Sequence, residues 1–389
     1  MNDGKYVFSQ IMAFVDHNEF NRCVERYDGN WRARHFTCWK QFLCMAFGQM
    51  THRESLSDTV LCLNSNASKL YHMGIGQKVA KTTLSRANET RDWRIYADFA
   101  ASLIEEARRL YGTDSQLDVE LKQNVFAIDS TVIDLCLSVY SWARFRRAKA
   151  AVKLHVQLDL KNSIPCFIDI SEGRVHDVNV LDLIDFEPDG FYVMDRGYKD
   201  FGRLYRIKQA KAFFVIRAMD NLAFKRLYSS AIDKQTGLRC DQIIRLTNPI
   251  PAMRYPDHLR RIKFFDSDQD RTFVFLTNNF DLAPLDIARL YKHRWQIELF
   301  FKWIKQHLKI KSFWGYDPNA VKTQVWIAVT VYVIVAIVKK RLNLNLSMYE
   351  ILQILSINIF DKTPINTLFQ QSYLQFFKEQ SCNQLQLFD

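Results

Sequence analysis

No C-x-x-C pair, internal repeat or low-complexity tract occurs in the 389 residues of this chain. The eight cysteines lie far apart, which argues against a zinc ribbon and against a disulfide framework. Buried free thiols in a reducing compartment are the expected state. The first residues, MNDGKYVFSQ, lack the basic segment and the apolar run of a signal peptide, so none is expected.

Long apolar runs are also missing, with one partial exception. The segment from Val325 to Val338 is apolar apart from Thr330 and covers 14 residues. A membrane-spanning helix needs roughly 18 or more such residues. The segment therefore predicts a fully buried core helix, and a membrane protein is not expected.

Acidic residues are fewer than basic ones, with 42 Asp and Glu against 53 Lys and Arg, for a net charge of +11. Such an excess favours a polyanionic partner, nucleic acid first and an acidic membrane surface second. A basic soluble protein without such a partner has the same composition. Hydrophobic residues make up 48% and charged residues 24%, which excludes a disordered chain. The length of 389 residues predicts two or three folded units.

Residues 1–111 predict helices, because apolar residues recur at intervals of three and four. A break at Gly74–Gly76 precedes a helix that Thr82 or Thr83 can cap. This second helix carries polar residues suited to reading DNA in a helix-turn-helix, although an ordinary helical hairpin fits equally well. The polar residues are Ser85, Arg86, Asn88 and Arg91.

Short β-type runs begin near Asn124, after a polar linker. They are VFAID, AVKLHVQLDL, IPCFIDI, FYVMD and AFFVIR. Three strands in succession, followed by strands that alternate with helices, predict an α/β (α+β) fold with a mixed sheet flanked by helices. Residues 218–277 predict a β-rich insertion, and Pro284 opens a long helix that runs to about Leu308.

Two of the predicted strands end on an aspartate, Asp129 and Asp195. An ionised carboxylate beside a sheet core is costly unless a charge or a metal ion compensates it. Two such strands in one sheet predict a shared site at its edge. The alternative is structural, because aspartate also favours turns after strands.

The long helix carries a polar stripe beside its apolar one. Tyr291, Arg294, Glu298 and Lys305 fall within roughly 60° of arc at about 100° per residue. This placement lets Glu298 face the sheet edge that bears the two aspartates, with Arg and Lys suited to phosphate. A solvated helix face with a simple ion pair between Arg294 and Glu298 is the alternative.

The spacing Tyr-x2-Arg-x3-Glu-x6-Lys resembles the Y-R-E-K signature of DDE transposases, in particular the family founded by insertion sequence 4. FAIDSTVIDL resembles the segment with the first catalytic Asp of that family, and VMDRGYKDF the segment with the second. The resemblance covers roughly residues 120–340. It implies a ribonuclease-H-like core in which Asp129, Asp195 and Glu298 are catalytic and bind two Mg²⁺ ions, with Mn²⁺ as a substitute.

The resemblance also implies the partners. Double-stranded DNA is expected, as the terminal inverted repeats of a transposon and as its target, with a homodimer on the DNA in the bacterial cytoplasm at the nucleoid. Tyr291, Arg294 and Lys305 would hold DNA near the cut, with Arg196 and Tyr198 close by. Related enzymes excise the element through a hairpin with a flipped base, for which Trp142 and Trp295 are stacking candidates, although core positions are the better interpretation for both.

A basic stretch, WARFRRAKAAVK, lies between the first two strands. Phosphate contact and a solvated basic loop are both open interpretations. Its cations are Arg144, Arg146, Arg147, Lys149 and Lys153. The lone histidines His155 and His176 are expected to be structural.

Four segments follow from these patterns. They are a helical DNA-binding domain (1–115), a catalytic core (120–217 and 278–341), a β-rich insertion (218–277) and a C-terminal helical segment with a tail (342–389). The function expected from the resemblance is cut-and-paste transposition of an insertion sequence. Another ribonuclease-H-like nuclease and a DNA-binding regulator without catalysis are the alternatives.

Overall fold

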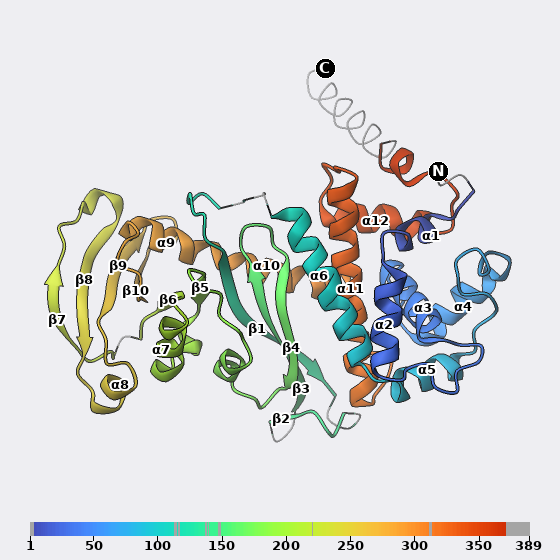
Figure 1. The fold of residues 1–389 in the computed structure, drawn as a ribbon, viewed down its shortest axis with the longest axis horizontal. Helices are drawn as coiled ribbons and strands as arrows, with labels where there is room; N and C mark the ends of the chain where they lie inside the picture. The colour runs from blue at the N-terminus through green and yellow to red at the C-terminus, as the bar shows by residue number, and fades with distance from the viewer. Residues whose placement is uncertain are drawn as a thin grey trace, which may run out of the picture. The chain divides into compact units, whose positions relative to one another are not determined.

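Two sets of residues pack as separate units in the computed structural model of the chain (Figure 1). The helical unit comprises Met1–Gly112 and Lys302–Asp389, and the sheet unit comprises Thr113–Phe301. The structure describes residues 4–112, 115, 117–136, 138, 140–146, 149–219, 221–310 and 313–370, without the side chains of residues 144–149.

The helical unit contains α-helices from both ends of the chain. They are α1 (Val7–Met12), α2 (His17–Arg26), α3 (Cys38–Met50), α4 (Leu56–Ser65), α5 (Lys81–Thr90), α6 (Arg94–Tyr111), α11 (Pro318–Arg341) and α12 (Met348–Asn358), with a short 3-10 helix η1 (Ala67–Lys69). Side-chain caps fix several of the starts, as where Thr37 accepts a hydrogen bond from the amide of Lys40. The predicted capping box of Ser347 and Glu350 is present at α12.

Helix α11 is the apolar segment singled out in the sequence. Its mean hydropathy of 2.0 and its 24 residues would suffice to cross a membrane, but 94% of its most apolar window is buried inside the protein. It packs against α3, α5, α6 and α12, and Figure 1 shows it alongside α6. The prediction of a buried core helix is confirmed.

The sheet unit contains one ten-stranded mixed sheet with short helices. Its strands are β1 (Val125–Leu135), β2 (Arg144–Arg146), β3 (Lys149–Asp159), β4 (Pro165–Glu172), β5 (Phe191–Met194), β6 (Phe213–Arg217), β7 (Phe224–Ser229), β8 (Leu238–Leu246), β9 (Leu259–Asp266) and β10 (Arg271–Thr277). Its helices are η2 (Asp177–Asp182), η3 (Arg196–Tyr198), α7 (Phe201–Gln209), η4 (Lys234–Thr236), α8 (Pro249–Arg254), α9 (Pro284–His293) and α10 (Trp295–His307), of which α10 continues into the helical unit.

Strand order confirms the predicted mixed sheet. β4, β3 and β1 are antiparallel neighbours, and β5 and β6 continue the sheet in parallel with β1. This is the ribonuclease-H-like arrangement. The β-rich insertion is also present, and its strand β10 pairs with β6, so that β10, β9, β8 and β7 extend the same sheet.

The two faces of the sheet are covered by different helices. Phe214 and Ile216 pack into a core cluster with Leu204 and Ile207 of α7. The alternate residues of these strands face the other way, where α9 packs against β5, β6 and β8. Both faces of the sheet are therefore buried around β5 and β6.

This division differs from the four segments expected from the sequence. Helix α11, which lies within the segment expected as the catalytic core, is covered by helices from the first 112 residues. The C-terminal segment joins the same helical unit, where α12 packs against α1, α3 and α11. The difference arises because the apolar sequence of a helix predicts that the helix is buried, but does not indicate which elements cover it.

Candidate active site

Asp129 and Asp195 occupy equivalent levels on two adjacent parallel strands. The parallel pairing of β1 and β5 ends at Ile128 and Met194, and each aspartate is the next residue. The sequence predicted that this strand ends at Asp129, but β1 continues to Leu135 and remains paired with β3. The two carboxylates therefore lie at one edge of the sheet, where the parallel hydrogen bonding stops.

The long helix predicted after Pro284 is broken at Arg294. Helix α9 ends at His293 and α10 begins at Trp295. Around the break the hydrogen bonds span three residues, from the amide of Arg294 to Tyr291 O (3.1 Å) and from the amide of Ile297 to Arg294 O (3.1 Å). The prediction of one continuous helix is wrong here, although Arg294 and Glu298 still lie close together.

Arg294 connects two of the three predicted catalytic carboxylates. Its Nη1 donates to Asp129 Oδ2 at 2.8 Å, and its Nη2 donates to Glu298 Oε1 at 2.5 Å. The Arg294 side chain is only 15% exposed, against 51% for that of Glu298. Glu298 is thus connected to the sheet edge through a largely buried guanidinium that it shares with Asp129. The alternative of a simple surface ion pair between Arg294 and Glu298 does not describe this arrangement.

The environment of Asp129 disfavours its charge. Burial raises the pKa of this carboxyl from 3.8 to about 6, although Arg294 and the amide of Ser130 act in the opposite direction. The charges of Glu298 and Asp195 raise the pKa further, so all three carboxylates interact electrostatically. Three carboxylates and one arginine leave this cluster with an excess of negative charge.

Tyr291 connects the third carboxylate to the insertion. Its hydroxyl donates to Asp195 Oδ1 at 3.3 Å, and its ring contacts Phe275 of β10 with centroids 4.7 Å apart. Burial raises the pKa of this hydroxyl to about 12. Tyr291 is therefore a neutral hydrogen-bond donor beside Asp195, held by the insertion strands.

The other residues that were expected to contact DNA differ in their exposure to solvent. Arg196 is exposed directly after Asp195. Tyr198 is only 2% exposed, and burial raises the pKa of its hydroxyl. Lys153 is buried, donates to Val175 O at 2.7 Å and pairs with Asp177 at 2.9 Å. In this arrangement Arg196 is presented to solvent, whereas Tyr198 and Lys153 are not.

The remaining predicted residues differ in exposure and in the unit to which they belong. Lys305 is on the part of α10 that belongs to the helical unit. The side chains of Arg144, Arg146 and Arg147 lie outside the described residues. Trp295 is 57% exposed, so the core position preferred for it in the sequence is wrong. The histidine predictions divide, because His155 is buried against Ser171 Oγ (2.8 Å) while His176 is exposed.

Arg217 was not singled out as a site residue. It closes β6 one residue after Ile216, which pairs with Met194, so it stands level with Asp195. Its guanidinium lies 5.4 Å from the ring centroid of Phe273, and its charge acts on Tyr291. The available signal was its place at the end of the run AFFVIR, at the same edge as the aspartates.

A divalent metal ion fits the donor set. Carboxylate oxygens are the ligands preferred by hard cations, and the partly uncompensated charge around Asp129 is of the sign that a cation relieves. As the side chains stand, no three His, Cys, Asp or Glu residues within the described part of the chain converge on a metal position. The guanidinium of Arg294 occupies one oxygen of Asp129 and one of Glu298.

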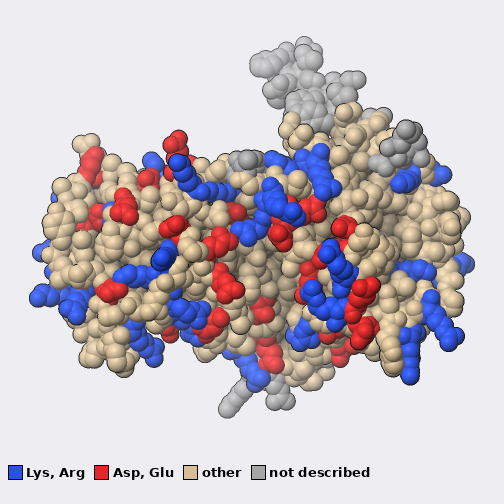
Figure 2. Space-filling model, viewed as in Figure 1, with Lys and Arg blue, Asp and Glu red and all other residues tan. Residues whose placement is uncertain are grey.

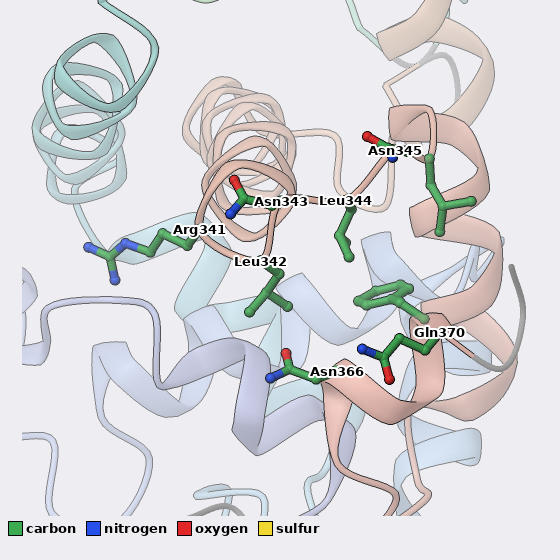
Figure 3. Close-up of a pocket in the computed structure, with 9 residues that line it drawn as sticks. Arg341, Leu342, Asn343, Leu344, Asn345, Asn366 and Gln370 are labelled. Carbon is green, nitrogen blue, oxygen red and sulfur yellow. The ribbon is translucent and has the colours of Figure 1, made fainter.

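The pocket drawn in Figure 3 has a different chemistry. It has a volume of about 550 Å³ and follows the end of α11 in the helical unit. Leu342 and Leu344 point toward Asn366 and Gln370 across it (Figure 3). Its lining contains amides and leucines and no carboxylate, so it offers no ligands for a hard cation.

A ribonuclease-H-like sheet with three carboxylates and an arginine at one edge defines an enzyme that acts on nucleic-acid phosphodiesters. The comparison with known families identifies it further. Residues 120–334, more than half of the chain, match the family described as Transposase DDE domain. The chain belongs to this family, whose members depend on divalent metal ions. Residues 3–76 match a family described as Domain of unknown function (DUF4372).

Individual relatives agree with this assignment. A protein of Sinorhizobium fredii named as a transposase, y4zB, is 34% identical over 264 residues, which cover 67% of this chain and 71% of the relative. A protein of Synechocystis sp. named as a transposase for insertion sequence element IS4SA is 28% identical over 276 residues (67% and 72%). One of Geobacillus stearothermophilus, named for insertion sequence element IS5377, is 29% identical over 230 residues (57% and 59%).

Proposed function

We propose that this protein is the transposase of an insertion sequence, which cuts DNA at the ends of its element and joins them to target DNA. The observation that carries the proposal is that Asp129 and Asp195 directly follow two paired parallel strands, and that Arg294 connects Asp129 to Glu298. Its partners are the terminal inverted repeats and the target duplex, with two copies of the chain on the DNA, in the bacterial cytoplasm at the nucleoid.

Asp129, Asp195 and Glu298 are the residues that would hold two Mg²⁺ ions. When bound, such ions activate an attacking water or 3′-hydroxyl and stabilise the leaving oxygen of an in-line displacement at phosphorus. The chain itself orients the DNA. No protein nucleophile is required.

Arg294 acts as an exchangeable cation in this proposal. In the free protein its guanidinium pairs with both Asp129 and Glu298 and balances one of their two charges. A DNA phosphate is an equally good bidentate acceptor for it, so bound DNA draws Arg294 away and leaves both carboxylates to the metal ions. Tyr291, the exposed Arg196 and Arg217 would contact neighbouring phosphates, and Lys305 keeps its expected role on the same DNA.

The exposed Trp295 supports one further step. It stands between Arg294 and Glu298 in the chain, with 57% of its surface open to solvent. An indole at this position can stack on a base flipped out of the duplex beside the cut. Excision through a hairpin at the transposon end is the route that this geometry favours.

The test uses a labelled duplex from the DNA that borders the reading frame and carries its inverted repeat. With Mg²⁺, we expect nicking at the repeat end followed by strand joining. Asp195→Asn and Glu298→Gln should each lower the nicking rate by at least about a thousandfold, because each removes a metal ligand. Asp286→Asn is the matched control, since this carboxylate on α9 pairs with Arg289 instead.

Each alternative has its own outcome in the same assay. Binding to the repeat without any cleavage by the unaltered protein would indicate a DNA-binding regulator. Cleavage that ignores the repeat sequence would indicate a general nuclease of the same fold. Either result would overturn the proposed function.

A further inference from the structure

Of the four polar residues that the sequence offered for reading DNA in the helical unit, Asn88 and Arg91 are turned inward, whereas Arg86 is exposed. Asn88 of α5 is buried, and its amide oxygen accepts from Gln41 Nε2 at 2.8 Å. Arg91 donates to Gln41 Oε1 at 2.8 Å and to the carbonyl of Phe36. These two side chains connect neighbouring helices, and their hydrogen-bonding groups are already engaged within the unit.

The loop that Arg91 contacts, residues 28–37 between α2 and α3, has the opposite character. Trp31, Arg32, Arg34 and His35 are exposed, and Trp31 has 70% of its surface open to solvent. The guanidinium of Arg32 lies over the Trp31 ring, 4.0 Å from its centroid. A large aromatic side chain is thus presented to water together with two arginines.

The loop is nevertheless firmly attached at both ends. The side chain of Asn30 accepts the amide of Cys38 at 2.8 Å, and the amide of Gly29 donates to Val24 O at 2.9 Å. Gly29 is tightly enclosed, since a Cβ there would lie 2.4 Å from Ile95 Cδ1. Fixed ends lower the entropy lost when a partner binds, which is a property of preformed binding loops.

The two arginines of this loop form no ion pair in the part of the chain that the structure describes, although the loop also carries the exposed Asp28. Within the described residues, Arg32 and Arg34 form no ion pair with a carboxylate, whereas Arg22 and Arg26 on the preceding helix pair with Glu19 and Asp98. The whole surface is not uniformly basic, because Figure 2 shows Lys and Arg interspersed with Asp and Glu on the face it presents. Unpaired arginines beside an exposed indole are therefore a local feature.

We propose that the loop 28–37 is a DNA-binding site, at which Arg32 and Arg34 bind backbone phosphates and Trp31 packs against the adjacent sugar. Arginine, with a neighbouring aromatic ring, matches the phosphate and sugar contacts that fix a protein on a duplex. Lys40, whose Nζ donates to His35 O at 2.8 Å, adds a further charge beside the loop. The inference rests on the proposed function, because it takes DNA as the polyanion, and it assigns a role within residues 3–76.

The experiment measures binding of the full chain to the labelled inverted-repeat duplex over a range of salt concentrations. We expect Arg32→Ala with Arg34→Ala to weaken binding on the order of tenfold at 0.1 M salt and to reduce the slope of log affinity against log salt by about 2. Arg22→Ala with Arg26→Ala is the matched control, because it removes two exposed but paired arginines of the same unit. Trp31→Ala should weaken binding without changing the slope, and Trp31→Phe should restore part of the loss.

Equal losses in the arginine pair and in the control pair, or an unchanged salt slope, would overturn the inference. So would stronger competition by single-stranded RNA or by anionic lipid vesicles than by unlabelled duplex. Unchanged thermal unfolding of each variant shows that the unit remains folded. If the unaltered protein neither binds nor cuts the repeat, the proposed function itself fails, whereas normal cutting with an indifferent loop refutes this inference alone.

Discussion

Replacement of Asp129 by asparagine should stabilise the protein while it removes activity. The pKa of this carboxyl rises from 3.8 to about 6 on folding, despite the arginine beside it. This difference corresponds to about 3 kcal/mol by which folding disfavours the ionised form. Asparagine has nearly the shape of the neutral acid, so Asp129→Asn avoids this cost in the absence of metal ions.

The dependence on pH follows from the direction of the shift. Because the folded pKa lies above the unfolded one, the cost is absent below about pH 4, grows up to about pH 6 and is constant above it. The gain in the free energy of unfolding should therefore be complete at pH 8 and about half as large at pH 5. For a unit of this size it raises the unfolding temperature on the order of 5–10 °C.

The assay is thermal or urea unfolding with a chelator present. Asp134→Asn is the control, because this exposed aspartate lies on the same strand. Added Mg²⁺ or Mn²⁺ should raise the unfolding temperature of the unaltered protein and leave that of Asp129→Asn nearly unchanged. A variant that is no more stable at pH 8, or whose gain is the same at pH 5, would refute the reasoning.

Three further predictions concern residues outside the carboxylates. Arg260→Ala should cost about 3–5 kcal/mol in urea unfolding, because it leaves Asp241 buried and unpaired, and a cost below about 1 would contradict this. Gly48→Ala should cost about 1–3 kcal/mol in the same measurement, since its Cβ would lie 2.6 Å from Trp314 Cη2, and no change would show that the ring moves aside freely. Tyr198→Phe should change DNA affinity less than twofold in a binding titration, because the hydroxyl is buried, and a larger loss would restore its expected contact with DNA.

The sequence was informative where the physical signal is local. Apolar runs that end on Asp129 and Asp195 predicted strands and a common edge, and the parallel register of β1 and β5 places both residues there. The spacing of Arg294 and Glu298 placed them on one helical surface, and their hydrogen bond agrees. The apolar length of α11 predicted burial, and its surroundings agree.

The sequence failed where the outcome depends on contacts across the fold. Lys153 looked like part of a basic loop, but β3 carries it into the interior beside Asp177. Tyr198 lies three residues after Asp195 in the chain, yet the short turn of η3 directs it into the core. The helical spacing of the sequence continues through Arg294 without a break, whereas α9 ends at His293 and α10 begins at Trp295.

The central claim is that Asp129, Asp195 and Glu298 together bind the catalytic metal ions. The most direct measurement replaces Mg²⁺ by Fe²⁺ on the protein bound to its inverted-repeat duplex and maps where locally generated hydroxyl radicals cut the polypeptide. We expect cuts near residues 129, 195 and 298 that disappear with excess Mg²⁺ and in the variant Asp195→Asn. Cuts confined to other segments, or cuts at only one of the three positions, would contradict it.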